Sequence, residues 1–356
     1  MKLKSDTQFK KELGELLKLV APGTPLREGL EMILQLSTGG LIVVGDTEKV
    51  LSAIDGGFQV DYPLTSTALA ELAKMDGAII LSRDAKRILY VNTQLVPDYL
   101  IPSKERGTRH RNAERMAKQT NCPVIAISQS RNTITLYQRE IKYVLKPLPE
   151  LISRANQALQ TLEKYRGVFD NVLMELEVLE FQNEVRLFNV VKVIQKGEMI
   201  RRIKEEVDRY IVELGEEARL IQMQLKEIVG ESLEETQQII QDYAKGDYDK
   251  SVAKLRLLTS DELLELPTIA EALGYGVRQK DLDIPVFPKG YRVMLKIPRL
   301  PKIVVENVVK SLGSLQNIVK TTPNELTKID EVGEKRANSI KTELEHLKNR
   351  ALMKKY

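Results

Sequence analysis

A long helical stretch without proline constrains this 356-residue chain more than any other feature. Between Leu151 and Ala244, apolar residues recur at spacings of three and four, as at Ile200, Ile203 and Val207. This is the spacing of one face of an α-helix. The pattern predicts a helical spacer without chemistry of its own, whose apolar faces also supply subunit contacts. We expect breaks between its helices at three glycines: Gly197, Gly215 and Gly230.

The residues before this stretch show the pattern of a compact α/β domain. Short apolar runs rich in β-branched residues occur at 41–44, 78–81, 124–127 and 133–137. Helical patterns lie between some of them, at 66–75 and 109–119. The run from 134 to 144 is typical of paired strands, so we expect a mixed central sheet. The predicted fold class is an α/β domain, an all-α spine and a small all-α domain, with boundaries at 1–147, 148–286 and 287–356.

Composition excludes several classes of protein. No apolar run approaches the ~18 residues of a membrane span, and the start of the chain has no signal-peptide core, so we expect a cytoplasmic protein. Cys122 is the one cysteine, which excludes a disulfide framework and a cysteine zinc site. The two histidines, His110 and His346, show no two-histidine metal motif. Any chemistry must come from carboxylates, hydroxyls, backbone amides and arginines.

Positive charge gathers at the end of the chain. Residues 287–356 hold 15 Lys and Arg against 7 Asp and Glu, a net charge of +8, whereas the whole chain carries +4. A basic terminal module on a mildly acidic chain indicates a polyanionic partner. A solvated lysine-rich surface is the alternative.

The run from Leu326 to Ile340 resembles the helix-hairpin-helix DNA-binding motif. In such a motif Gly333 lets the backbone approach a phosphate, the following helix offers free N–H groups, and Lys335 and Arg336 add charge. The motif usually has a second glycine where this chain has Glu331, whose negative charge should weaken the hold on phosphate.

An earlier segment, Ile297–Val309, has the same layout and would supply a partner hairpin with Arg299 and Lys302 exposed. Contacts of this kind go to phosphates, so binding would be salt-sensitive and independent of DNA sequence. The alternative is a helical packing module that binds a protein.

Two short segments of the α/β domain carry candidate chemistry, although the domain has no Walker loop, Rossmann fingerprint or nucleophile elbow. Asp76 and Gly77 lead directly into the strand that begins at Ala78, and a carboxylate there could hold a divalent cation close to a reacting hydroxyl. The segment Thr108–Arg111 opens a predicted helix with a hydroxyl, two arginines and His110. A helix N-terminus with two guanidinium groups is suited to a triphosphate.

Together these segments carry a resemblance to a family. Asp76-Gly77-Ala78 and Arg109-His110-Arg111 are similar to the paired signatures of diadenylate cyclase domains. With a helical spine and a helix-hairpin-helix module behind them, they resemble the bacterial DNA integrity scanning proteins, the DisA family. The resemblance covers essentially the whole chain, including Val20–Arg27 and Ile297–Pro301.

The resemblance implies condensation of two ATP into cyclic di-AMP with release of two pyrophosphates, in the presence of Mg²⁺ or Mn²⁺. It implies that Asp76 binds the metal or assists deprotonation of the attacking hydroxyl, and that Leu95 contacts the adenine. The catalytic set it implies is Asp76, Arg109, His110 and Arg111. The ATP-binding set it implies is Gly77, Ala78, Leu95, Thr108, Arg109, His110, Arg111, Asn112, Ser128 and Arg131.

The family pattern also implies an assembly and a partner. Two cyclase domains face each other, so a homo-oligomer is expected, an octamer with the spines at its centre. Branched DNA bound through Arg299, Lys302, Gly333, Lys335 and Arg336 would serve DNA-damage checkpoint and repair signalling at the nucleoid.

The chain departs from the family pattern at Asn112, where threonine is common, and at Gln129 and Ser130, where arginines are common. These departures leave the implied catalytic residues intact, and we expect them to weaken nucleotide binding. The alternative function is a non-catalytic, nucleotide-sensing scaffold that binds DNA. A nuclease or ligase accessory is disfavoured because its carboxylate cluster or lysine motif is absent.

Overall fold

The computed structural model describes residues 2–353. The outer ends of the first and last predicted domains, at residue 1 and residues 354–356, lie outside the described residues. The chain divides into two compact units. The first comprises Met1–Asn156 and Asp208–Gln222, and the second comprises Gln157–Val207 and Met223–Tyr356. No helix within residues 2–353 is long and apolar enough to cross a membrane.

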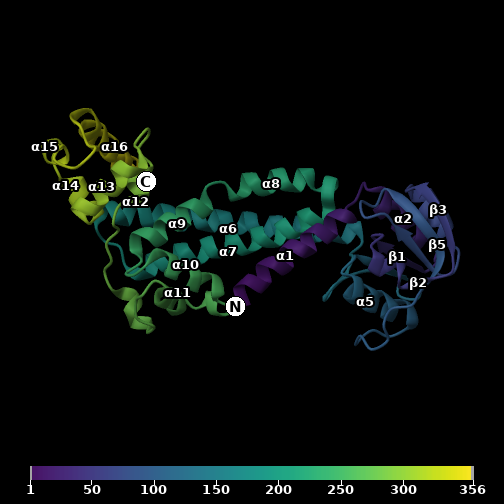
Figure 1. Ribbon diagram of the computed structural model, residues 1–356. Helices are drawn as coiled ribbons and strands as arrows, with labels where there is room; N and C mark the ends of the chain where they lie inside the picture. Colours follow the sequence, from purple (N-terminus) through teal and green to yellow (C-terminus); the bar gives the residue numbers. More distant parts are fainter. Residues whose placement is uncertain (1, 354–356) are drawn as a thin grey trace. The chain divides into compact units, whose positions relative to one another are not determined.

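The first unit is the predicted α/β domain, extended by the ends of helices that it shares with the second unit (Figure 1). Its own helices and strands are α1 (Lys2–Leu19), α2 (Pro25–Gln35), β1 (Gly40–Val44), α3 (Glu48–Leu51), β2 (Ile54–Asp55), β3 (Phe58–Pro63), α4 (Ser66–Leu72), β4 (Ala78–Leu81), β5 (Arg87–Leu95), α5 (Thr108–Thr120), β6 (Val124–Ser128), β7 (Thr133–Gln138) and β8 (Ile141–Val144).

These strands form one mixed sheet, as predicted. Its order is β2-β5-β4-β1-β6-β7-β8, and β3 pairs with β5 outside this path. Strands β1 and β4 are parallel, whereas β1 and β6 are antiparallel. The apolar runs predicted as strands form β1, β4, β6 and β7, and residues on both faces of these strands are buried. Strands β2, β3 and β5 were not predicted from the sequence.

Helices cover both faces of this sheet, so the unit has three layers. Alternate strand residues point to opposite faces. Ile42 and Val44 pack in one apolar core with α2 and α4, and Leu41 and Val43 pack in a second core with α5. The helix that carries the predicted phosphate-binding residues is thereby fixed against the sheet.

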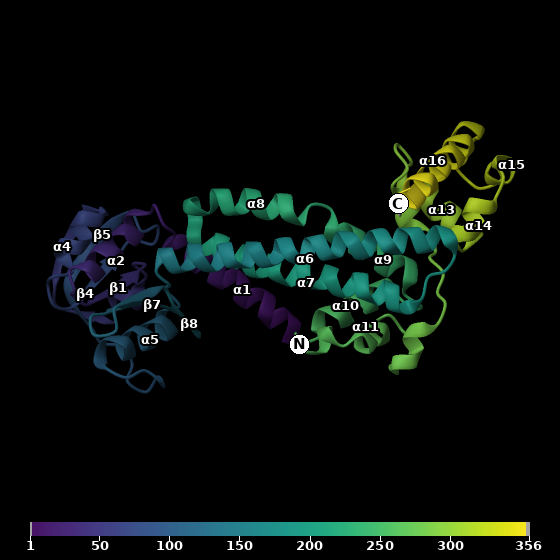
Figure 2. The same ribbon diagram turned by 180° about the vertical axis from the view of Figure 1, so that it is seen from behind.

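The second unit is helical. It is built from α6 (Leu148–Gln182), α7 (Leu187–Leu214), α8 (Arg219–Val229), α9 (Ser232–Tyr243), α10 (Tyr248–Leu257), α11 (Leu266–Ala272), α12 (Tyr291–Leu295), α13 (Lys302–Leu312), α14 (Leu315–Lys320), α15 (Pro323–Leu326) and α16 (Glu334–Met353), the first three of which it shares with the first unit. Figure 2 shows α6 and α7 side by side.

The predicted helix breaks are confirmed at Gly215 and Gly230 but wrong at Gly197. Both correct positions have positive φ, whereas Gly197 lies inside α7. A Cβ on Gly197 would lie 2.0 Å from Oγ1 of Thr236, so this glycine provides space for helix packing rather than a chain break. The prediction missed the break between α6 and α7. It begins at Asn183, which directly follows the last residue of α6 and has the left-handed conformation.

The C-terminal residues form two pairs of helices, each joined by a short hairpin turn, and the pairs share one apolar core. Helices α12 and α13 flank the first hairpin, and α15 and α16 flank the second. Asn307 of α13 donates a hydrogen bond from Nδ2 to the carbonyl oxygen of Asp330 in the second hairpin, at 3.0 Å. The two hairpins are therefore tied to each other.

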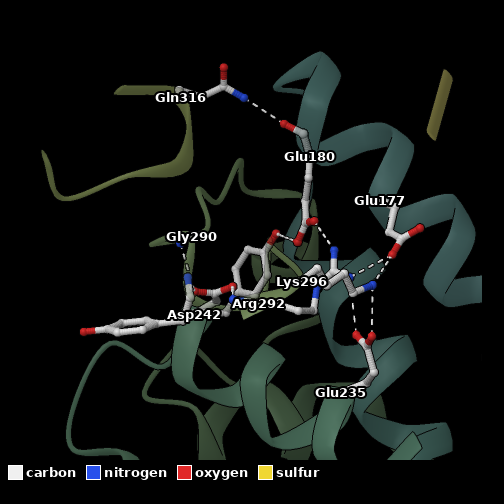
Figure 3. A network of polar contacts seen from close by, with 10 residues as sticks. Glu177, Glu180, Glu235, Asp242, Gly290, Arg292, Lys296 and Gln316 are labelled. Atoms are coloured by element: carbon white, nitrogen blue, oxygen red, sulfur yellow. Dashed lines mark hydrogen bonds and ion pairs between the residues drawn. The ribbon is translucent and has the colours of Figure 1, made fainter. Parts of the chain in front are cut away.

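A buried ionic network anchors this module to α6 and α9 within the second unit (Figure 3). Arg292 of α12 is 1% exposed and contacts Glu177, Glu180 and Glu235. Asp242 of α9 accepts hydrogen bonds from the backbone N–H groups at the start of α12, at 2.7–3.1 Å. The network fixes the first hairpin relative to the spine helices of the same unit.

Candidate functional site

An open pocket of about 520 Å³ lies at the amino-terminal ends of β1 and β4. Its volume is within the ~300–1,000 Å³ range of small-molecule sites. The residues that line it are Leu41, Asp55, Gly56, Gly57, Asp76, Gly77, Ala78, Asn92, Thr93, Gln94, Leu95, Thr108, Arg109 and Asn112. The two signature segments of the sequence therefore meet at one pocket.

Gly77 permits the backbone of β5 to lie close to the start of β4, beside Asp76. Its φ is +95°, and an added Cβ would lie 2.8 Å from the carbonyl oxygen of Thr93. The Thr93 hydroxyl donates a hydrogen bond to the carbonyl oxygen of Ala78 at 3.0 Å. Glycine is needed here for the approach of β5, which places the exposed Asp76 at the pocket.

The first turn of α5 forms the opposite side of the pocket. Gly107 is its N-cap at φ 86°, with no side-chain cap. Helix N–H groups near Thr108 are consequently free of a capping side chain, and the helix dipole adds partial positive charge. Asn112, one turn later, also lines the pocket.

The guanidinium group of Arg109 lies against Gly39, the residue before β1. Arg109 Nη1 donates a long hydrogen bond to the carbonyl oxygen of Ile127, at 3.5 Å. A Cβ on Gly39 would lie 2.1 Å from Nη1 and 2.5 Å from Cζ of Arg109. Gly39 thus makes room for the arginine, a role that the sequence analysis missed although the Gly39-Gly40 pair before a strand was a signal.

A Gly39→Ala substitution should therefore displace Arg109 and weaken the binding of an anionic substrate in the pocket. The clashing atoms end a flexible side chain, so the arginine should move while the backbone stays. Charge-assisted contacts contribute ~1.5–3 kcal/mol, so their loss corresponds to roughly a 10- to 100-fold decrease in kcat/KM. Steady-state kinetics check this, with Gly14→Ala as control because an added Cβ there meets nothing within 4 Å. Unchanged kcat/KM would contradict the prediction.

Four predicted nucleotide-binding residues do not line the pocket: His110, Arg111, Ser128 and Arg131. His110 turns toward Tyr137, whose hydroxyl lies 3.0 Å from its Nδ1. Ser128 ends β6, and its hydroxyl accepts the backbone N–H of Arg131 at 3.3 Å. Arg111 and Arg131 are exposed, so they remain available to a ligand larger than the pocket.

The pocket also contains residues that the sequence analysis missed, in the β2–β3 turn and at the end of β5. Asp55 adds a second carboxylate. Asn92, at φ 54°, has the left-handed conformation that asparagine tolerates. The signal for the turn was the Asp55-Gly56-Gly57 sequence, whereas nothing in the sequence marks the end of β5 as a pocket wall.

The oxygen atoms that line the pocket suit a hard divalent cation that is bound by the protein and by the substrate together. Across residues 2–353, no group of three or more His, Cys, Asp or Glu side chains could hold a metal ion. Asp55 and Asp76 offer oxygen ligands only. Mg²⁺ and similar ions commonly take one or two carboxylates and complete their shell with water and phosphate oxygens.

The C-terminal hairpins present the predicted DNA-binding residues at their surface. Arg299, Lys302, Gly333, Lys335 and Arg336 are all exposed. Lys302 is the first residue of α13, and the residue that caps this helix supplies no side-chain hydrogen bond. Gly333 immediately precedes α16. Each hairpin is thus followed by a helix N-terminus.

Both hairpins have a non-glycine residue at positive φ. Arg299 has φ 59° and Glu331 has φ 67°. This conformation explains why glycine is usual at the position of Glu331. Arg336 Nη1 donates a hydrogen bond to the carbonyl oxygen of Glu331 at 2.6 Å and lies 3.6 Å from its carboxylate. Glu331 therefore holds one of the predicted DNA contacts.

Two family models match this chain. Residues 27–141 match the model described as DisA bacterial checkpoint controller nucleotide-binding, and residues 145–282 match the DisA bacterial checkpoint controller linker region. A DNA integrity scanning protein DisA from Carboxydothermus hydrogenoformans is 52% identical, over 93% of this chain and 96% of the relative. Its counterpart from Clostridium kluyveri is 49% identical, over 96% of this chain and 97% of the relative.

The chain belongs to the DisA family. The predicted family and fold class are confirmed, and the chain is an enzyme of the diadenylate cyclase type. The DisA nucleotide-binding region contains the pocket with Asp76, Gly77, Thr108 and Arg109. The hairpin module follows the two matched regions of this DisA chain.

Proposed function

We propose that this DisA chain condenses two ATP into cyclic di-AMP and that its C-terminal module binds the DNA backbone. One observation carries the proposal: a single pocket is lined both by Asp76 and by the first turn of α5. A carboxylate and a phosphate-binding helix end are the two groups that nucleotidyl transfer needs. We also propose the organisation into a cyclase domain (1–147), a helical linker (148–286) and a helix-hairpin-helix domain (287–356).

The reaction is two successive nucleotidyl transfers. In the first, the 3′-hydroxyl of one ATP loses its proton and attacks the α-phosphorus of the other. In the second, the remaining 3′-hydroxyl of the linked product loses its proton and attacks the α-phosphorus of the remaining triphosphate. A new O–P bond forms, the bond from the α-phosphorus to the bridging oxygen breaks, and pyrophosphate leaves. The enzyme's contribution to such a step is positioning and neutralisation of charge.

The residues around the pocket divide this work. The N–H groups of α5, with Thr108 and Arg109, neutralise the triphosphate, and Arg111 and Arg131 extend the positive charge beyond the pocket. Leu95, which lines the pocket, supplies an apolar surface for the adenine. Gly77, Ala78 and Asn112, which line the pocket, and Ser128, which lies outside its lining, complete the proposed nucleotide site.

A divalent cation fits the oxygen donors of the pocket. Asp76 would hold Mg²⁺ or Mn²⁺ together with substrate oxygens, and Asp55 is near enough to line the same pocket. The bound ion would neutralise phosphate charge and acidify the attacking hydroxyl. Asp76 would position that hydroxyl or accept its proton.

Two ATP molecules need two facing sites, so we propose a homo-oligomer, with an octamer as the predicted form. The resemblance to the family predicts branched DNA as its partner, and the two tied hairpins would present two helix ends to the phosphates. We propose that the protein acts in DNA-damage signalling at the nucleoid, in the cytoplasm.

Replacing Glu331 should strengthen the proposed DNA contact. We expect Glu331→Gly to lower the Kd for DNA several-fold, because it removes a carboxylate together with its ion pair to Arg336 and suits the positive φ. Fluorescence anisotropy with a labelled branched duplex at two salt concentrations measures the change. Glu331→Gln separates charge from backbone conformation, since only glycine relieves the conformation. Equal Kd values for wild type and both variants would rule out this role of Glu331.

The test of the enzymatic proposal is product analysis. The full chain is incubated with ATP and Mg²⁺ or Mn²⁺, with and without a chelator, and the nucleotides are separated by chromatography. Cyclic di-AMP that requires the cation supports the proposal. Failure to form it with either ion, by a chain that still binds DNA, would favour the nucleotide-sensing scaffold.

A further inference from the structure

The side chain of His110 is held by a tyrosine on the sheet beneath α5. Its Nδ1 lies 3.0 Å from the Tyr137 hydroxyl, and the two rings meet edge to face with centroids 6.2 Å apart. Tyr137 lies on β7 and is 1% exposed. His110 Nε2 is buried and has no hydrogen-bond partner. The third residue of α5 is thus tied to the core through one ring nitrogen.

The contacts that support His110 continue beyond Tyr137. Glu105, in the loop before α5, interacts with the Tyr137 hydroxyl through its negative charge. The Glu105 side chain is 7% exposed and forms an ion pair with Lys142 of β8. Three side chains from a loop and two strands therefore support one histidine of the signature.

Hydrogen-bond chemistry assigns the donor and the acceptor between His110 and Tyr137. Since Nε2 is buried without a partner, a proton on Nε2 would be a buried donor left unpaired, which costs more than an unpaired lone pair. A proton on Nδ1 can instead be donated in a hydrogen bond to the Tyr137 hydroxyl oxygen. Burial, and next the negative charge of Glu105, raise the pKa of Tyr137, which keeps the hydroxyl protonated.

The result is a neutral histidine with a lone pair on Nε2. Burial lowers the pKa of His110, and Arg131, Lys142 and Arg109 lower it further against the opposing charge of Glu105. A neutral Nδ1-protonated ring cannot donate a hydrogen bond from Nε2 to a phosphate oxygen. The arginines of the signature must then supply the phosphate contacts.

We propose that Tyr137 and Glu105 are positioning residues of the cyclase site. They hold His110 as its Nδ1-protonated tautomer and thereby fix the first turn of α5, from which Thr108 and Arg109 enter the pocket. This inference rests on the proposed function of the pocket. It assigns a role to two residues outside the paired signatures, one in the preceding loop and one on β7.

The test uses the full chain with Tyr137→Phe, which removes one hydroxyl. Tyr143→Phe is the matched control, because the Tyr143 hydroxyl donates to a glutamate, Glu213, at 2.6 Å in the same unit. Both variants remove a tyrosine hydroxyl that interacts with a glutamate, and both should lower Tm by similar amounts. A role in stability alone would affect both variants alike.

The decisive measurement is the tautomer of His110, by NMR of ¹⁵N-labelled histidine. The chain has two histidines, so a His346→Gln background leaves a single ring signal. We expect Nδ1 protonation in the wild type and in Tyr143→Phe, and loss of that preference in Tyr137→Phe. Glu105→Gln, which keeps an acceptor oxygen, should preserve the tautomer better than Glu105→Ala.

Kinetics supply the functional half of the test. Tyr137→Phe should lower kcat for cyclic di-AMP at least tenfold, and Tyr143→Phe should leave it within twofold of wild type. An unchanged tautomer in Tyr137→Phe, or equal kcat in the two variants, overturns the proposal. A wild type without cyclase activity overturns the proposed function instead, and the NMR result then still decides how His110 is held.

Discussion

Asp76→Asn should abolish most cyclic di-AMP synthesis, with a loss of at least about 100-fold in kcat, the lower end of what a positioned acid or base contributes. Asparagine has nearly the same shape but lacks the negative charge needed to hold a cation or accept a proton. Asp76 is exposed at the pocket, so its loss should change the free energy of unfolding by no more than about 0.5 kcal/mol.

Chromatography of the nucleotides measures this loss, and thermal unfolding confirms that the variant is folded. Asp46→Asn is the control, because Asp46 is an exposed carboxylate of the same unit that does not line the pocket. Asp55→Asn shows whether the second pocket carboxylate shares the role of Asp76. Full activity of Asp76→Asn would remove this residue from the catalytic set.

Arg292→Met should lower the stability of the second unit by about 3–5 kcal/mol, the cost of leaving buried charges without their partner. Arg292 joins Glu177, Glu180 and Glu235 at a site where Glu180 is fully buried. Burial opposes ionisation of Glu177, but Arg292 and Lys296 together hold its pKa at about 2. Removing the arginine leaves this cluster of carboxylates with one lysine.

Urea unfolding measures this effect, and hydrogen exchange in α9 and α12 locates it. Lys296→Met is the matched control, because Lys296 contacts Glu177 and Glu235 but its side chain is 30% exposed. A partly exposed ion pair contributes about 1 kcal/mol or less. Equal losses in the two variants would show that burial of Arg292 does not decide the strength of the network.

Local patterns in the sequence were sufficient for much of the fold. Strands β1, β4 and β6 were predictable because continuous apolar runs favour strands buried on both faces. Helix α5 followed from its helical spacing, and Asp76 and Arg109 were identified by their signatures. These features depend on neighbours within a few residues, which the sequence displays directly.

Other features depend on residues distant in the chain, and only the tertiary structure decided them. Gly197 was predicted to end a helix, but Thr236 occupies the space beside it and the helix continues. A glycine that breaks a helix and a glycine that admits a neighbour look the same in sequence.

The sequence by itself determined the family, the α/β and helical parts, and the residue types for phosphate and cation chemistry. The tertiary structure decided which of those residues share a pocket: Arg109 enters it over Gly39, while His110 turns to Tyr137. It also decided that Arg292 is buried among carboxylates more than fifty residues away. Side-chain partners depend on how the chain folds back on itself, and no local pattern records that.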